Sequence, residues 1–333
     1  MIRTVFLGLG RCLPERVVTN NDLSQWMDTT DDWIVDRTGI RERRWVGEEC
    51  GGSDLGAEAA REACERACVP LAEVDCIIVA TLSPDHAFPG TACFMQAKLD
   101  LPGVPALDIR NQCSGFLYGL SVADAWIRCG TYRRVLLVGT EVHSTGLDVS
   151  TEGRDVACLF GDGAGAVLLG PAEEGSDRGV LSVHLHADGH HAKDLWIEAP
   201  SSRTVPQRIT PEMLAEGKQF PKMRNRRVFT SAVQKMPEVI REALAQNEIG
   251  LEQIKLVVPH QANQRITEAV AKQLGISDEI MFSNIEFLGN TTAASIPLAL
   301  YDAEQQGRIK KGDLIMLAAF GAGFTWGASL LRW

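Results

Sequence analysis

One order of structural elements occurs twice along the chain. In the first half, the pattern predicts alternating helices and strands at 53–67, 74–81, 90–99, 106–109, from 113 onward, and 135–139. In the second half, the same order returns at 231–246, 254–258, 264–274, 281–284, from 289 onward, and 314–320. Apolar β-branched runs that alternate with amphipathic stretches are typical of an α/β fold. We therefore predict a duplicated α/β unit, with one half over residues 1–172 and the other over 173–333.

Residues 199–226 fit neither copy of the repeat. This stretch holds four prolines and many polar residues, which favour a loop over a regular element. We expect a cap or long loop here, with one short helix after Thr210.

Composition narrows the class of protein. The 333 residues are 45% hydrophobic, which is enough for a sizeable core. A formal net charge of -10 argues against nucleic acid as a partner, because phosphate binding needs a basic surface. No apolar run reaches the roughly 18 residues of a membrane span, and the N-terminus lacks a signal pattern. We expect a soluble cytoplasmic protein, and the nine cysteines without a C-x-x-C pair to be reduced thiols.

Cys113 is the candidate nucleophile. It follows the short strand A-L-D-I and precedes S-G-F-L-Y-G-L, which has helical periodicity. A thiol at the N-terminus of a helix lies near the positive end of the helix dipole, so we expect a lowered pKa and a reactive thiolate. The other eight cysteines are interpreted as small apolar packing residues.

His260 and Asn290 stand at comparable places in the second copy. His260 follows an apolar strand in V-V-P-H-Q-A-N, and Asn290 opens a helix in G-N-T-T-A-A-S. Either residue alone could be structural, as a buried histidine or as a helix N-cap. The repeat pairs Cys113 with Asn290 and places His260 at the end of a strand, where α/β sheets build their sites.

A Cys, a His and an Asn suit one particular reaction. A thiolate takes an acyl group from a thioester and holds it as a new thioester. Loss of carbon dioxide from a malonyl thioester puts negative charge on an oxygen, which a His ring N–H and an Asn amide stabilise. The Gly-rich turn A-A-F-G-A-G-F can bring backbone amides close to a reacting carbonyl. A hydrolase would need a base that activates water, and the pattern does not obviously supply one.

Two further motifs carry weaker signals. The G-D-G-A-G-A segment at 161–166 resembles a dinucleotide loop, but it lies between strand-like sequences and is interpreted as close backbone packing. His184, His186, His190 and His191 suggest a metal site. The histidines are not interpreted as part of a complete ligand set with a carboxylate or cysteine, so we expect no metal.

Several segments together resemble the β-ketoacyl-acyl-carrier-protein synthase III family. The resemblance runs from Thr4 to Trp333 and rests on D-D-W-I-V-D-R-T-G-I-R-E-R-R, N-Q-C-S-G-F, F-G-D-G-A-G-A, V-P-H-Q-A-N-Q-R-I, G-N-T-T-A-A-S and F-G-A-G-F-T-W-G. It implies the thiolase-like fold, a duplicated unit in αβαβα layers, and a homodimer. It also implies condensation of an acyl-CoA primer with malonyl-acyl carrier protein, which starts fatty-acid synthesis. No cofactor beyond these thioester substrates is implied.

The same resemblance implies roles for individual residues. Cys113 is similar to the acylated nucleophile, and His260 and Asn290 to the decarboxylation pair. The amides of Cys113 and Ala322 resemble an oxyanion hole. The remaining implied contacts concern the substrates: Phe320 and a Phe88 lent by a second subunit for the acyl pocket, Trp33, Arg37, Arg154 and Asn263 for CoA, and Arg265 for the carrier protein.

Departures from the family pattern leave the primer open. The nucleophile lies in N-Q-C-S-G where C-A-G is common, the 199–226 segment is longer, and Asn225 stands where a glycine is common. Arg224, Arg226 and Arg227 would then lie near the tunnel mouth, either as a solvated charge run or as a docking patch for an acidic carrier protein or acyl chain.

Three functions remain open at this point. The first is the initiating synthase with acetyl-CoA or another short acyl-CoA. The second is a related condensing enzyme or acyltransferase of specialised metabolism with an unusual primer. The third is a non-catalytic scaffold, against which the intact Cys113, His260 and Asn290 argue. Thiolase itself would need a second catalytic cysteine near the C-terminus, and none follows Cys158.

Overall fold

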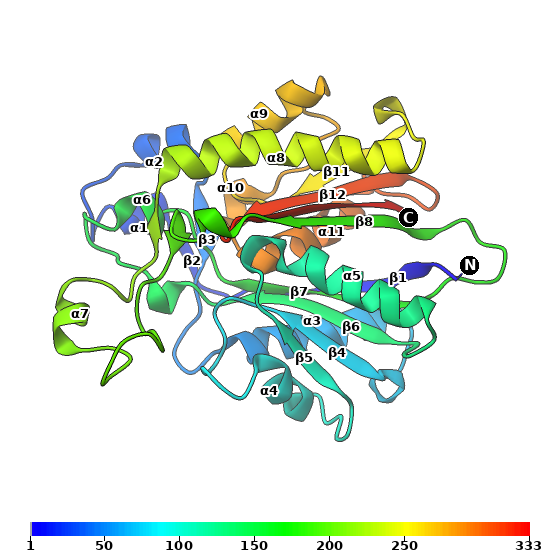
Figure 1. Ribbon diagram of the computed structural model, residues 1–333, viewed down its shortest axis with the longest axis horizontal. Helices are drawn as coiled ribbons and strands as arrows, with labels where there is room; N and C mark the ends of the chain where they lie inside the picture. The colour runs from blue at the N-terminus through cyan, green and yellow to red at the C-terminus, as the bar shows by residue number, and fades with distance from the viewer. Residues whose placement is uncertain (1) are drawn as a thin grey trace.

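The computed structural model describes residues 2–333, which form two sheets and the helices around them (Figure 1). The first sheet has the order β1-β7-β6-β4-β5 and the second the order β11-β12-β13-β8. The strands of the first sheet are β1 (Thr4–Cys12), β4 (Cys76–Ala80), β5 (Ala106–Ile109), β6 (Val135–Glu141) and β7 (Gly163–Pro171). Those of the second are β8 (Gly179–Ala187), β11 (Leu256–Pro259), β12 (Leu314–Gly321) and β13 (Thr325–Arg332).

The two sheets have the same internal arrangement. In the first, β4 runs parallel to β5 and β6, whereas β7 is antiparallel to β6 and β1. In the second, β11 is parallel to β12, and β13 is antiparallel to β12 and β8. Met281 forms a parallel bridge with Val257 at the position that β5 occupies in the first sheet. All strands of the first sheet precede residue 172, and all strands of the second follow it.

Helices complete a five-layer α-β-α-β-α stack. The outer layers are α3 (Gly52–Arg66) with α4 (Thr91–Lys98), and α8 (Asn225–Gln246) with α9 (Gln264–Leu274). The middle layer is α5 (Gly115–Arg128) with α11 (Ser295–Gln305), and its apolar side chains pack between both sheets. Figure 1 shows α5 and α11 between the sheets and α8 and α9 on one outer face. The predicted duplicated α/β fold is confirmed.

A tight 3-10 turn precedes each central helix. The turns span Gln112–Ser114 and Thr292–Ala294, and their first residues have φ of 44° and 47°. The two turns thus correspond residue by residue, so the equivalent of Cys113 in the second copy is Ala293. The predicted pairing of Cys113 with Asn290 is therefore wrong, because Asn290 lies two residues before its turn. The sequence comparison paired the polar residues that precede the two helices. It could not detect the 3-10 turn that separates Asn290 from α11.

Small elements cover one end of the sheets, where the strands approach the site. They are α1 (Asn20–Leu23), α2 (Asp31–Thr38), α6 (Arg154–Ala157), α10 (Ile285–Leu288), β2 (Val17–Thr19) and β3 (Glu42–Arg44). They share a separate apolar cluster that includes Leu23, Ile34, Trp45 and Ile285. Four more single 3-10 turns lie at Leu71–Glu73, Ser144–Gly146, Gly189–His191 and Leu251–Gln253.

The 199–226 region projects from the stack around a short helix (Figure 1). That helix, α7 (Pro211–Ala215), is capped by Thr210 and confirms the prediction. β9 (Leu195–Trp196), just before this region, pairs with β10 (Lys222–Met223), near its end. The predicted end of the loop is wrong, because α8 begins at Asn225, six residues before its expected start. Within residues 2–333, none of the helices is both long and apolar enough to span a membrane.

Candidate active site

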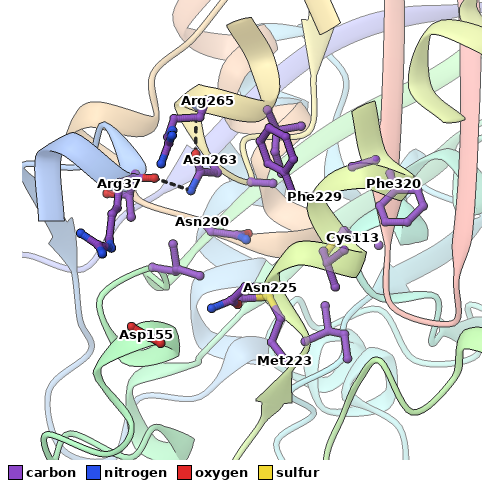
Figure 2. Close-up of a pocket in the computed structure, with 18 of the residues that line it drawn as sticks. Arg37, Cys113, Asp155, Met223, Asn225, Phe229, Asn263, Arg265, Asn290 and Phe320 are labelled. Carbon is purple, nitrogen blue, oxygen red and sulfur yellow. Dashed lines mark hydrogen bonds between the residues drawn. The ribbon is translucent and has the colours of Figure 1, made fainter. Parts of the chain in front are cut away.

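Cys113, His260 and Asn290 line one cavity of about 560 Å³. Cys113 lies in the 3-10 turn before α5, His260 follows β11 directly, and Asn290 lies between α10 and the turn before α11. The three side chains thus come from both copies of the repeat and meet between the sheets. Figure 2 shows Cys113 near Phe320, with Asn290 between Cys113 and Arg37.

The Cys113 thiol is deeply buried. Burial raises its pKa to about 12, and the charge of Glu141 acts in the same direction. The backbone amides of Cys113 and Ala322 act in the opposite direction, since both approach the sulfur. The predicted lowering of the Cys113 pKa by the helix end is therefore wrong, because desolvation outweighs it.

A second cavity of about 720 Å³ also reaches Cys113. Its lining includes Ser83, His143, Trp196 and Ala322. The nucleophile therefore lies at the junction of two spaces, with His260 and Asn290 bordering the first of them only. This arrangement suits a covalent acyl group held in one space while a second substrate enters through the other.

His260 is a neutral imidazole. Burial lowers its pKa to about 3, and the nearby His143 contributes in the same direction. Its Nδ1 lies 2.7 Å from the Ser295 hydroxyl. Its Nε2 is buried and has no hydrogen-bond partner among the described residues. A buried polar atom without a partner is costly, so an atom of the substrate is expected to complete it.

Asn290 is oriented by its neighbours. Its backbone N–H donates to the carbonyl of Leu159 at 2.8 Å, and its side-chain oxygen accepts the N–H of Thr292 at 2.9 Å. With the oxygen engaged, the amide NH₂ is the group left for the cavity. His260 and Asn290 therefore present uncharged groups to the same space as the Cys113 thiol, which fits stabilisation of an anionic oxygen rather than activation of water.

Aromatic and cationic side chains gather at the outer end of the first cavity. The guanidinium of Arg37 lies 4.3 Å from the ring centre of Trp33, and that of Arg154 lies 5.0 Å from it. Trp33 and Arg37 line the cavity, whereas Arg154 does not and instead contacts the backbone oxygen of Asp28. A flat heterocycle can stack on such a pair, although Arg37 and Arg154 both already occupy positions over Trp33.

The remaining predicted polar contacts divide into two groups. Asn263, Arg265 and Arg226 line the first cavity, and Asn263 caps α9 while donating to the backbone oxygen of Arg37 at 2.9 Å. Figure 2 shows Arg37, Asn263 and Arg265 together, away from Cys113. Arg227 lies outside the cavity and lines a shallow hollow next to it, at the start of α8.

The two predicted acyl-pocket residues differ strongly in solvent exposure. Phe320 is buried beside the first cavity, with its ring centre 4.8 Å from that of Phe324. Phe88 is 81% exposed and lines neither of the two cavities. Within a single chain, the second cavity is bordered by other residues, including Trp196 and His143.

Comparison with known proteins identifies the family. The model of 3-oxoacyl-[acyl-carrier-protein (ACP)] synthase III matches residues 107–189, and that of its C-terminal region matches residues 244–333. The β-ketoacyl-[acyl-carrier-protein] synthase III of Rhodospirillum rubrum is 47% identical over the full length of both chains. The chain belongs to the β-ketoacyl-acyl-carrier-protein synthase III family. It is thus a condensing acyltransferase, as the residue pattern predicted.

Two solved structures share the fold over almost the whole chain. The 3-oxoacyl-[acyl-carrier-protein] synthase III of Aquifex aeolicus is 41% identical, with a TM-score of 0.90, and the alignment covers 99% of this chain and all of that one. The priming β-ketosynthase of the R1128 polyketide pathway is 31% identical, with a TM-score of 0.88 and coverage of 99% and 96%.

Four polar residues of this synthase III site escaped the sequence analysis. Glu141 ends β6 and His143 lies just beyond it. Thr292 begins the 3-10 turn before α11, and Ser295 is the first residue of that helix. All four are buried. The available signal was a run of polar residues, T-E-V-H, directly after an apolar strand, and T-T-A-A-S directly after Asn290.

The two weaker motifs have structural explanations. His184 Nδ1 and His186 Nε2 contact the two oxygens of Glu242 at 3.2 and 2.7 Å, so their partner comes from α8 rather than from nearby sequence. No cluster of three or more metal-binding side chains occurs among residues 2–333. The 161–166 segment enters β7, where a Cβ on Gly165 would lie 2.8 Å from Pro297. Close packing therefore accounts for these glycines.

Proposed function

We propose that this synthase III joins an acyl-CoA primer to malonyl-acyl carrier protein by decarboxylative condensation, and so starts fatty-acid synthesis. The observation that carries the proposal is the position of Cys113 at the junction of two cavities, beside two neutral groups aimed into one of them. The reaction needs no cofactor beyond its thioester substrates. In this proposal the enzyme works in the cytoplasm.

The first half-reaction loads the primer. The Cys113 sulfur attacks the thioester carbonyl, the carbon–sulfur bond to CoA breaks, and the thiol proton leaves with CoA. The amides of Cys113 and Ala322 approach the sulfur, so they are placed to receive the oxygen of the tetrahedral intermediate. Trp33 and Arg37 hold the adenine, with Arg154 as their neighbour, and Asn263 borders the path of the pantetheine arm.

The second half-reaction makes the new carbon–carbon bond. The malonyl thioester loses carbon dioxide, and the negative charge that appears on its thioester oxygen is stabilised by His260 and Asn290. The resulting carbon attacks the carbonyl of the acyl-Cys113 thioester, whose carbon–sulfur bond breaks. The released thiolate takes a proton from solvent. Because both stabilising groups are uncharged, neither forms a salt bridge with the anionic malonyl carboxylate.

Two surface features suit protein partners. Arg265, Arg226 and Arg227 form a basic rim at the mouth, which suits an acidic carrier protein. Phe88 and Leu107, which lies on the edge strand β5, are exposed apolar residues. A second copy of the chain would cover them and would bring a Phe88 to the acyl cavity of its neighbour. We include this homodimer in the proposal.

Intact-protein mass spectrometry tests the proposed reaction. The wild-type enzyme is mixed with acyl-CoAs of increasing length, and Cys113→Ala is the matched control. We expect a covalent acyl adduct that requires Cys113 and disappears into a ketoacyl product when malonyl-acyl carrier protein is added. The preferred primer would separate fatty-acid initiation from specialised metabolism. If no acyl-CoA forms an adduct, a CoA-primed synthase is excluded.

A further inference from the structure

The second cavity, which also borders Cys113, is larger than an acetyl group fills and is partly polar. Its volume of about 720 Å³ lies in the range of pockets that hold a drug-sized ligand. Apolar side chains form part of its wall, among them Leu147, Leu195 and Ile197. Such a wall suits the methylene groups of an acyl chain. The polar side chains in the same lining then indicate what the far end of that chain carries.

Arg110 is the only lysine or arginine among the described residues that line this cavity. The residue is exposed, and its side chain has no hydrogen-bond or ion-pair partner within residues 2–333. Arg110 directly follows β5 and precedes Cys113 by three residues, so their α-carbons lie at most about 11 Å apart. A primer of a few carbons on the Cys113 sulfur can therefore reach the guanidinium.

Two further polar side chains of the lining have groups without partners. His143 is 8% exposed, and its Nε2 lies 2.7 Å from the Thr292 hydroxyl, whereas its Nδ1 has no partner among the described residues. The Gln112 amide likewise makes no hydrogen bond within the described part of the chain. Burial lowers the pKa of His143 to about 3, so its ring is neutral. An alkyl chain satisfies none of these groups, whereas oxygen atoms at a chain end can bond to them.

Asp85 is the one carboxylate in the described lining, and it does not neutralise Arg110. Its two oxygens accept the backbone N–H of Ser53 at 2.9 Å and the Ser53 hydroxyl. Ser53 lies in the first turn of α3, where the helix dipole compensates a negative charge. The guanidinium of Arg110 is thus left for a negative charge that the described residues do not supply.

The homodimer proposed above increases the need for such a charge. Leu107 lies on the edge strand that leads into Arg110, and a second subunit that covers Leu107 would shield the guanidinium from water. A shielded cation without a partner is costly, and a carboxylate that accepts two parallel hydrogen bonds from it removes that cost.

From this lining we propose that Arg110 selects a primer whose acyl chain ends in a carboxylate, as in the half-thioesters of dicarboxylic acids. The apolar wall holds the methylene groups, and Arg110 binds the terminal carboxylate beside the neutral Gln112 and His143. The acyl transfer is unchanged, because the Cys113 sulfur forms the new thioester and CoA leaves. This specificity rests on the function proposed above.

Loading of matched primers tests the specificity. Adipyl-CoA and hexanoyl-CoA have acyl chains of equal length and differ in the terminal group, and intact-protein mass spectrometry follows acylation of Cys113. We expect wild type to load adipyl-CoA at least as fast as hexanoyl-CoA. In Arg110→Gln, we expect the ratio of adipyl to hexanoyl loading rates to fall about tenfold, as for loss of a hydrogen-bonded charged pair. Its remaining hexanoyl loading shows that the variant is folded.

Arg133→Gln is the matched control, since it removes an exposed arginine that lines neither cavity. Its ratio of loading rates should equal that of wild type. A wild-type enzyme that loads hexanoyl-CoA but not adipyl-CoA would overturn the inference. An unchanged ratio in Arg110→Gln would also overturn it, and would leave Arg110 to contact solvent or the second subunit.

Binding to Cys113→Ala separates this inference from the proposed function, because it requires no acyl transfer. Ligand-observed NMR compares monomethyl adipate with methyl hexanoate. We expect monomethyl adipate to bind, and the added substitution Arg110→Gln to weaken its binding about tenfold. This result, together with a wild-type enzyme that no acyl-CoA acylates, would refute the proposed function alone. Normal loading of hexanoyl-CoA, together with monomethyl adipate that does not bind or binds equally without Arg110, would refute the specificity alone.

Discussion

Gly321 leaves the space that the nucleophile occupies. A Cβ added at this residue would lie 2.6 Å from the Cβ of Cys113 and 3.0 Å from its sulfur. Gly321 ends β12 in extended backbone, so the constraint is steric and not conformational. We predict that Gly321→Ala displaces the thiol and slows acyl loading by about 100-fold, since small displacements of reacting groups have effects of this order. Stopped reactions analysed by intact-protein mass would measure the loss.

Gly47→Ala is the control for this substitution. Gly47 is exposed, and a Cβ there would have no atom within 4 Å. The control should load at the wild-type rate. Loading by Gly321→Ala at a similar rate would show that the thiol can move aside, and that the contact with Gly321 does not position it.

At the scale of residues, the chain pattern identified the side chains that meet but not their electrostatic state. Cys113, His260 and Asn290 follow strands or precede helices, which is visible along the sequence. The pKa of Cys113 depends on burial between two sheets, and residues far apart in the chain create that burial. Ser295 and Glu141 were missed for the same reason, because their partners lie on other elements.

At the scale of elements, agreement was closest where local signals were strong. The strand at 106–109 and the helix at 264–274 were predicted at their observed bounds, and Gly275 ends the helix in a left-handed conformation. The predicted start of α8 was wrong because local signals are weak there. Arg224 caps the helix without any side-chain hydrogen bond, and Pro237 lies inside it. Packing against β12 and β13 holds this helix where local signals do not.

Glu141 connects the end of β6 to two neighbouring segments, and it makes their stability depend on pH. Its carboxylate accepts the Ser83 hydroxyl at 2.5 Å and the N–H groups of Leu82 and Ala293 at 3.2 and 3.4 Å. Burial nevertheless raises its pKa from 4.5 to about 7. A carboxyl with a raised pKa favours the folded state at low pH, and this contribution is lost as the pH rises from about 4.5 through about 7.

We predict that this loss amounts to about 3 kcal/mol for Glu141, by the relation between pKa shift and free energy. Urea unfolding at pH 5 and pH 8 would measure it as the change in the difference between wild type and Glu141→Gln. Glu141→Gln should be less stable than wild type at pH 5. The difference in their free energies of unfolding should be smaller at pH 8. Glu65→Gln, at an exposed glutamate of α3, should show no such change. A constant gap for Glu141→Gln would contradict the prediction.

At the scale of the whole molecule, the repeat predicted the architecture because both copies show helix and strand periodicity in the same order. It did not predict the two cavities. They exist because the turns before α5 and α11 meet between the sheets, and because β9 and β10 close one side. The 195–223 segment has no counterpart in the first copy, so the repeat gave no information about the wall that it forms.

The distribution of charge over the molecule predicts where an acidic carrier protein binds. The chain has a formal net charge of -10, yet Arg226, Arg227 and Arg265 are exposed at or beside the cavity mouth. An acidic carrier protein would be repelled by most of the surface and attracted only to this rim. We predict that the double substitution Arg226→Glu with Arg227→Glu raises the KM for malonyl-acyl carrier protein by about tenfold at low salt, since each surface pair contributes up to about 1 kcal/mol. Added salt should raise the wild-type KM toward that of the variant, because it screens the attraction.

Two comparisons separate carrier docking from other effects of these charges. Malonyl-pantetheine fills the cavity without a protein partner, so its KM should be nearly equal for wild type and the double variant. Lys311→Glu changes an exposed charge on the turn before β12, away from the cavity lining, and should leave the carrier KM unchanged. An equal rise in KM for both malonyl substrates would place the arginines on the path of the pantetheine arm. An unchanged carrier KM would mean that Arg265 or another part of the mouth receives the carrier, and the start of α8 would then be a solvated charge run.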